Sequence, residues 1–250
     1  MKIIKCHTTS STNDDLREYA LENHSEETVA LLAFHQKNGK GQRGRFWHAE
    51  ENKSLTFSML YKSIEIPFAQ IFQIHVCVSI ALLDFLTEIT RQEINFHVKW
   101  PNDIMAENKK CAGILIETIS SERTVNEMII GIGVNLNNTD FPNQLVHAVS
   151  LKQISGEHYS IENSFKTLIE RIEKKMRTIP MLDDWNGIFE EYQQRLFKRN
   201  QRIQVTYKNK QLEVEVQGVD ESGRLVVREE ELGIIHASYE ELKWNYNLLR

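Results

Sequence analysis

Cysteine is scarce in this chain of 250 residues, and its three cysteines, Cys6, Cys77 and Cys111, form no CxxC pair. This spacing excludes a disulfide-linked scaffold and the usual ligand set of a structural zinc site. A reducing cytoplasm is the simplest setting, so we expect a cytoplasmic location. The nine histidines also lack the spacing of a metal site, and we predict no metal held by a cluster of side chains.

Excess positive charge and long apolar runs are absent too. The chain has 30 lysines and arginines against 35 acidic residues, a formal net charge of −5, so we expect no binding of nucleic acid. Its most apolar stretch, residues 71–86, contains Gln73, His75, Ser79 and Asp84, which favours a buried helix and no membrane span. Residues 1–7 hold only a brief apolar pair, unlike a signal peptide.

Glycine is uncommon, but three of the eleven glycines lie in the stretch GKGQRGR, residues 39–45. Glycines let a backbone approach a ligand closely, while Lys40, Arg43 and Arg45 can bind phosphate or carboxylate. The stretch also spells GxGxxG, but no helical pattern follows in residues 46–52, which excludes the dinucleotide-binding turn of a Rossmann fold. Taken alone, it is either an anion-binding loop or a solvated basic loop.

Residues 94–100 alternate apolar and polar side chains, as a half-buried strand does, with Lys99 on the polar face. Pro101 cannot donate to a sheet ladder and ends the strand. Asn102 and Asp103 then place an amide and a carboxylate at the strand end, where binding sites are often assembled.

Residues 109–117, KKCAGILIE, bring two lysines to the mouth of a short apolar strand in which Gly113 permits close backbone approach. Such lysines are suitable charges for an anionic ligand. An ordinary hairpin over residues 102–110, with lysines protecting its tip, is the structural alternative.

The remaining patterns predict an α/β domain followed by a β module. Ser11 and Thr12 stand three residues before Asp14 and Asp15, the spacing of a capping box, which predicts a helix start. Further helices are predicted at 71–86, 161–177 and 185–197, and strands at 29–34, 55–61, 94–100, 112–118 and 128–136. Four short strands at 202–207, 211–217, 224–228 and 234–236 predict a small barrel or sandwich, with a boundary near residue 198.

Together these motifs resemble the biotin protein ligase family over nearly the whole chain. Gln36 with residues 39–45 resembles the family's biotin and adenylate loop, and residues 99–103 resemble its KWPND motif. Residues 110–117 are similar to its KxAGILxE strand. Two weaker signatures agree, at residues 11–13 and 131–137.

The resemblance implies an α/β (α+β) fold of the class II synthetase-like biotin and lipoate ligases, with a mixed sheet and helices in residues 1–198. It also implies an SH3-like C-terminal β-barrel in residues 199–250. The implied activity is that of an ATP-dependent ligase, with Mg²⁺ on the ATP phosphates. The enzyme makes biotinyl-5′-AMP and transfers biotin to a lysine of a biotin carboxyl carrier domain of a biotin-dependent carboxylase.

Site residues follow from the same motifs. Catalytic roles are implied for Lys110, Arg43 and Lys40. Biotin contacts are implied for Ser11, Thr12, Asn13, Gln36, Gly39, Lys40, Gly41, Gln42, Lys110 and Gly113. Contacts to ATP or the adenylate are implied for Arg43, Arg45, Trp47, Lys99, Asn102, Asp103 and Asn135.

Three of these roles have alternatives. Trp47 either covers the ligand's apolar ring or is an ordinary core tryptophan. Asp103 orients Lys99, binds a metal or simply forms a turn, and Asn135 either contacts the adenylate or holds the glycine-rich turn.

The chain departs from the family pattern at two positions of the loop. Gln42 stands where many members have arginine. Lys40 stands where arginine is frequent, which replaces a bidentate phosphate contact with a point charge. The Gln42 departure supports one alternative, a biotin-binding protein without activity. A lipoate or octanoate ligase or transferase is the other alternative, because it shares the same fold.

Only ten residues precede Ser11, too few for a three-helix DNA-binding unit, so we expect no operator binding. An exposed sheet edge would allow a homodimer.

Overall fold

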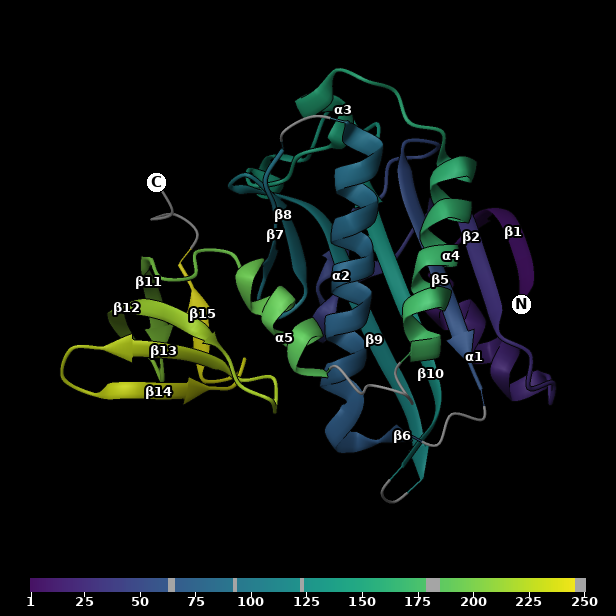
Figure 1. The fold of residues 1–250 in the computed structure, drawn as a ribbon. Helices are drawn as coiled ribbons and strands as arrows, with labels where there is room; N and C mark the ends of the chain where they lie inside the picture. The colour runs from purple at the N-terminus through teal and green to yellow at the C-terminus, as the bar shows by residue number, and fades with distance from the viewer. Residues whose placement is uncertain (63–65, 92–93, 122–123, 179–184, 246–250) are drawn as a thin grey trace.

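The computed structural model describes residues 1–62, 66–91, 94–121, 124–178 and 185–245. A large mixed sheet with helices on its faces is followed by a smaller sheet near the C-terminus (Figure 1). Within the described residues the helices are α1 (Thr12–Glu22), α2 (Ile71–Thr90), α3 (Leu151–Ser155), α4 (Ile161–Thr178) and α5 (Trp185–Gln194).

The strands of the larger sheet are β1 (Lys2–Thr9), β2 (Val29–Gln36), β5 (Ser54–Tyr61), β6 (Ile66–Pro67), β7 (Phe96–Lys99), β8 (Asp103–Ala106), β9 (Lys109–Ser121) and β10 (Thr124–Asn135). Their order is β1-β2-β5-β10-β9-β8-β7, with β6 beside β10. The β1–β2 pair is parallel, and the other described pairs of this sheet are antiparallel.

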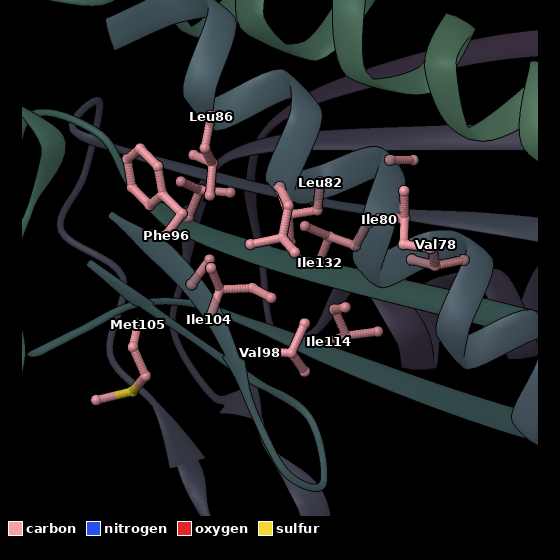
Figure 2. Close-up of a cluster of buried hydrophobic side chains, with 14 of the residues drawn as sticks. Val78, Ile80, Leu82, Leu86, Phe96, Val98, Ile104, Met105, Ile114 and Ile132 are labelled. Atoms are coloured by element: carbon pink, nitrogen blue, oxygen red, sulfur yellow. The ribbon is translucent and has the colours of Figure 1, made fainter. Parts of the chain in front are cut away.

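One face of the large sheet is covered by α2 and α4 (Figure 1). Val78, Leu82 and Leu86 of α2 lie over Val98 and Ile104 of the β7–β8 hairpin (Figure 2). Burying one such side chain contributes about 1.5–3 kcal/mol, so this layer firmly positions the strands that carry the KWPND motif. By length and composition α2 could cross a bilayer, but most of its apolar stretch is buried in this core, as the sequence predicts.

The opposite face of the sheet changes character along its length. Beside α1 it is apolar, where Leu16 packs with Leu60 of β5 and Ile129 of β10. Residues of a strand alternate between its two faces, so every second residue shares this face. Further along β5 and β10, and on the neighbouring β9, the residues on this face are small or polar. These residues are Thr56, Ser58, Gly113, Gly131 and Gly133. The first turn of α1 reaches this part of the sheet at Ser58 and Gly131, and the remainder is left to form a site.

The second sheet has five antiparallel strands in the order β14-β13-β12-β11-β15. Its strands are β11 (Arg202–Tyr207), β12 (Lys210–Val219), β13 (Leu225–Glu229), β14 (Gly233–Ala237) and β15 (Leu242–Trp244). The first four match the predicted strands, and β15 was not predicted. The barrel closure and the boundary at residue 198 stay predictions, and residues 246–250 of the proposed second domain lie outside the described residues.

The second sheet contacts the first domain through specific side chains. Trp100 Nε1 donates to the Gly223 carbonyl oxygen at 2.9 Å, and Gln193 of α5 exchanges two hydrogen bonds with the backbone of Val219. The tip of the β7–β8 hairpin is therefore held from both sides, by the α2 core and by the second sheet.

The predicted start of the first helix is confirmed, but two local details differ from the sequence pattern. Ser11 is the N-cap of α1, but its side chain makes no capping hydrogen bond, while a complete capping box forms instead at Ser150 with Gln153. Lys99 lies on the polar face of its strand but is only 4% exposed, and its Nζ lies 5.0 Å from the ring centroid of Trp244 in the second sheet. A strand's polar face is buried when another part of the chain folds over it.

Candidate ligand-binding site

A cavity of about 450 Å³ lies over the small and polar part of the large sheet. The predicted site residues that line it are Ser11, Thr12, Asn13, Gln36, Lys40, Gly41, Gln42, Arg45, Trp47, Asn102, Asp103, Lys110 and Gly113. Segments that are far apart in sequence therefore meet at one ligand-sized space.

Four predicted site residues lie elsewhere. Gly39 and Arg43 line a neighbouring groove on the outer side of the glycine-basic loop, residues 39–45. Lys99 is buried and is not among the residues that line the cavity. Asn135 is buried too, and its Nδ2 donates to the Val149 carbonyl oxygen at 3.2 Å, so its side chain holds a neighbouring backbone segment.

The floor of the cavity is made by glycines on adjacent strands. Gly113 of β9 pairs with Gly133 of β10. A Cβ on Gly133 would lie 2.3 Å from Cε2 of Trp47, and one on Gly113 would lie 3.3 Å from the same indole ring. The Trp47 ring therefore lies flat on the backbone of this floor, as a cover over the sheet outside the main hydrophobic core.

The glycine-basic loop folds as a small hairpin of β3 (Gly39–Lys40) and β4 (Phe46–Trp47), joined by a 3₁₀ turn at Gln42–Gly44. Gly44 has a φ of 74° and Arg43 a φ of 57°, so the turn uses the left-handed region twice in succession. Only glycine adopts that region at little cost. No helix follows the loop, which agrees with the exclusion of a Rossmann turn.

On each side of the loop, a carboxylate forms an ion pair with one of the loop's cationic side chains. Lys40 Nζ lies 2.5 Å from Oδ1 of Asp14 on α1, and Arg43 Nη2 lies 3.1 Å from Oε1 of Glu240 in the second sheet's last loop. Both pairs are substantially exposed. Exposed pairs of this kind contribute about 0–1 kcal/mol, so an incoming anion can replace the carboxylates.

The two arginines of the loop pack over the ring of Tyr239. The guanidinium carbons of Arg43 and Arg45 lie 4.7 Å and 5.8 Å from its ring centroid, and the ring also lines the cavity. The ring centroid of Trp100 lies 5.8 Å from that of Tyr239. The second sheet therefore contributes directly to the wall of the site.

A β-bulge places Lys110 at the cavity. Between β8 and β9, Ile104 pairs with Ala112 and Met105 with Lys110, which leaves Cys111 as the extra residue. Bulges re-aim neighbouring side chains. Lys110 Nζ lies 2.5 Å from Oδ1 of Asp103 and 5.4 Å from the centroid of the Trp47 ring.

Asp103 lies between two lysines. Burial lowers the pKa of Lys99 to about 7; Asp103 opposes this shift, while Lys110 and Arg45 add to it. The cavity wall therefore carries more positive than negative charge around one carboxylate. This arrangement favours an electrostatic role for Asp103 over a metal-binding one. Among the residues the structure describes, no group of three His, Cys, Asp or Glu side chains could hold a metal ion.

The other end of the cavity is neutral and polar. The Thr12 backbone N–H donates to Gln36 Oε1 at 2.8 Å, and the Ser58 hydroxyl contacts both Thr12 Oγ1 and Asn13 Oδ1. A Cβ on Gly131 would lie 2.2 Å from Asn13 Oδ1, so only glycine leaves room for this amide. The site thus has a cationic end at Lys110 and an uncharged hydrogen-bonding end at Gln36.

Sequence reasoning missed part of the wall. Residues 144–148 line the cavity, and the Lys110 backbone joins them through an N–H donated to the His147 carbonyl oxygen at 2.7 Å. No motif marks this segment. Tyr239 was missed because nothing in the four predicted C-terminal strands indicated a contact with the loop. The sequence signal that could have indicated this contact is Tyr239 followed by Glu240 and Glu241, an aromatic ring beside two carboxylates that can pair with the loop's arginines.

The fold and the cavity define a class: an α/β protein that holds a small ligand between a sheet and a glycine-rich basic loop. Residues 6–135 match the Biotin/lipoate A/B protein ligase family, and residues 199–235 match the Biotin protein ligase C terminal domain. The chain belongs to the biotin/lipoate A/B protein ligase family, and the resemblance inferred from its motifs is confirmed.

Individual relatives agree with this assignment. The Bifunctional ligase/repressor BirA of Bacillus subtilis is 33% identical over 171 residues, which are 67% of this chain and 51% of that protein. The Biotin--[acetyl-CoA-carboxylase] ligase of Mycobacterium tuberculosis is 31% identical over 138 residues, covering 55% of this chain and 49% of that one. The chain thus spans about half the length of the curated relatives it matches.

Solved structures confirm the fold. The biotin protein ligase from Aquifex aeolicus in complex with biotin and ATP has a TM-score of 0.80 at 24% identity, covering 98% of both chains. A point mutant of that ligase in complex with biotin has a TM-score of 0.79 at 26% identity, again with 98% of both chains covered. The predicted mixed α/β fold with a C-terminal β module is therefore confirmed.

Proposed function

We propose that this chain is an ATP-dependent biotin–protein ligase. The observation that carries the proposal is the two-ended cavity, in which neutral polar groups at Thr12 and Gln36 face a cationic end at Lys110. Biotin has the matching shape: a polar, uncharged urea ring at one end and a carboxylate at the other. The C-terminal match to biotin protein ligases favours biotin over the lipoate branch of the family.

In the first step a carboxylate oxygen of biotin attacks the α-phosphorus of ATP. The bond to the β-phosphate breaks, and biotinyl-5′-AMP and pyrophosphate form. Both reactants are anions, and fixed positive charge offsets their repulsion as the transition state develops. Lys110 is held at the floor by Asp103 and the bulge, so it is preorganised for this role. Lys40 and Arg43 join it when the ligand displaces their acidic partners, and Arg45, which lies over the Tyr239 ring, adds a further positive charge at the cavity.

Mg²⁺ is expected to neutralise the phosphates of ATP when that substrate is bound. Asp103 is the one acidic residue among the described residues that line the cavity, and its Oδ1 contacts Lys110, so this lining offers a single carboxylate to such an ion. Magnesium fits this chemistry because it commonly binds through substrate phosphates and waters.

In the second step the amine nitrogen of a carrier lysine attacks the acyl carbon of the adenylate. The acyl–oxygen bond to AMP breaks, AMP leaves and the amine loses a proton. The nucleophile comes from a biotin carboxyl carrier domain of a biotin-dependent carboxylase. Trp47 and the glycine-basic loop cover the floor, which would protect the adenylate from water until the carrier arrives.

ATP–pyrophosphate exchange with purified protein and Mg²⁺ tests the first step. Exchange with biotin alone, among biotin, lipoate, octanoate and no acid, supports the proposal. Exchange with lipoate or octanoate would assign the chain to the sister activity, and biotin binding without any exchange would make it a binding protein. Transfer is then measured as the mass gain of a carrier domain, with its acceptor lysine replaced by arginine as the control.

A further inference from the structure

The neutral end of the cavity is connected to a charged pair outside it. Glu117 of β9 accepts a hydrogen bond from Arg17 Nη2 at its Oε1 and one from Asn13 Nδ2 at its Oε2, both at 2.7 Å. Arg17 and Asn13 both belong to α1, so the carboxylate ties the helix to the sheet. Glu117 does not line the cavity; it contacts a residue that does.

This carboxylate fixes the orientation of the Asn13 amide. An ionised carboxylate only accepts hydrogen bonds, so Asn13 must turn its NH₂ group toward Glu117 and its Oδ1 away. The Oδ1 atom then accepts from the Ser58 hydroxyl at 2.6 Å. An amide without this carboxylate could present either end to Ser58.

The hydrogens of the next two groups can be counted. Ser58 and Thr12 have one hydroxyl hydrogen each, but three contacts to serve: Ser58–Asn13 at 2.6 Å, Ser58–Thr12 at 2.7 Å and Thr12–Gln36 at 3.1 Å. Amide oxygens cannot donate. Giving the two hydrogens to the two shorter contacts makes Ser58 donate to Asn13 and Thr12 donate to Ser58, and it leaves no hydrogen for the longer Thr12–Gln36 contact.

The result is a defined pattern at the cavity. Gln36 Oε1 is satisfied by the Thr12 backbone N–H, and its Nε2 has no hydrogen-bond partner among the described residues. Gln36 thus offers donors, while the Thr12 oxygen offers a lone pair. A cyclic urea needs that pair of contacts, because its carbonyl oxygen accepts and its N–H groups donate.

We propose that Glu117, held by Arg17, is a positioning residue that selects acids with a urea ring by directing the hydrogens of Asn13, Ser58 and Thr12. The inference rests on the proposed function, since it explains which acid the site prefers. An acid with an apolar ring, such as lipoate, makes no hydrogen bonds with these groups, so its affinity does not depend on the direction of their hydrogens. Glu117 therefore sets specificity without touching the substrate.

The test compares Glu117→Gln with wild type and with Glu162→Gln, a matched change at an exposed glutamate that pairs with Lys5. Glutamine has the same shape but supplies a donor, which removes the requirement on Asn13. Ser58→Ala is the second variant, because it removes a hydrogen of the chain and leaves Glu117 in place. Thermal unfolding of each variant checks that it is folded.

Dissociation constants are measured for biotin, for desthiobiotin, which keeps the urea ring, and for lipoate. The affinity of Glu117→Gln for both urea acids is expected to fall about 10- to 100-fold, as for a buried group left without its partner. The affinity for lipoate and the KM for ATP are expected to stay within about twofold of wild type on the same reasoning, and Ser58→Ala to follow the same pattern.

Biotin affinity of Glu117→Gln within twofold of wild type would overturn the inference. An equal loss for biotin, lipoate and ATP would also overturn it, since that pattern belongs to general structural damage. Wild-type protein that exchanges pyrophosphate only with lipoate or octanoate would overturn the proposed function and this inference with it. The two failures are thereby distinguished by the wild-type measurement.

Discussion

Lys99 provides the sharpest physical test of the site. Its side chain is 4% exposed, and its Nζ lies 5.0 Å from the ring centroid of Trp244. Burial is the main cause that lowers its pKa from 10.5 to about 7, against the attraction of Asp103. We consider Lys99→Met, which keeps much of the volume of the side chain and removes the charge.

The direction in which stability changes with pH follows from the protons that Lys99 binds in the folded and unfolded states. Between about pH 7 and 10.5 the unfolded chain holds a proton on Lys99 that the folded chain has lost, so wild-type stability rises with pH in this window. The contribution is about 1.4 kcal/mol per pH unit, or at most about 5 kcal/mol over the whole window. Below pH 7 both states are protonated, and the burial cost is present in full.

Methionine has no proton to lose. The free energy of unfolding of Lys99→Met is therefore expected to exceed that of wild type at about pH 6.5, with a difference that shrinks by about 2–3 kcal/mol by pH 9. Urea unfolding at several pH values measures it, with Lys109→Met as the control because Lys109 is exposed. Parallel stability profiles of wild type and Lys99→Met would refute the reasoning.

Three further outcomes are expected. Lys110→Ala should slow biotin-dependent pyrophosphate exchange about 10²–10³-fold, and near-normal turnover would contradict its role. Gly133→Ala should weaken biotin binding, because the added Cβ would lie 2.3 Å from the Trp47 indole and move that cover; unchanged affinity by calorimetry would count against the glycine floor. Tyr239→Ala should raise the KM for ATP about threefold or more while Tyr239→Phe stays near wild type, since only alanine removes the ring beneath the loop arginines. Equal KM values for the two variants would exclude a role for the ring.

The sequence predicted the elements whose packing is local. The apolar run of α2 and the alternation in β5 mark a buried helix and a strand wherever they occur, and both lie where predicted. The edge strand β1 was missed because its outer residues, such as Ile3, remain exposed and give no periodic signal. Short elements such as β15 depend on a partner strand and are not specified by three residues alone.

The site could be predicted only as far as its motifs extend. Most of the motif residues line one cavity, because the strands that carry them are neighbours in the sheet. The burial of Lys99 and the contact of Arg43 with Glu240 could not be predicted, since each depends on how the second sheet packs against the first. Contacts between distant segments leave no periodic trace in either one.

The second sheet contributes Tyr239 and Trp244 to the surroundings of the site, and this has a consequence for the newly made protein. Ser11 leaves the ribosome long before Tyr239 and Trp244 do. Until those two residues emerge, Lys99 lacks its contact with the Trp244 ring, and the loop arginines lack theirs with the Tyr239 ring. A chain halted near residue 235 would carry nearly every motif of the site and still present it half assembled, so the site is completed only after translation has passed Trp244.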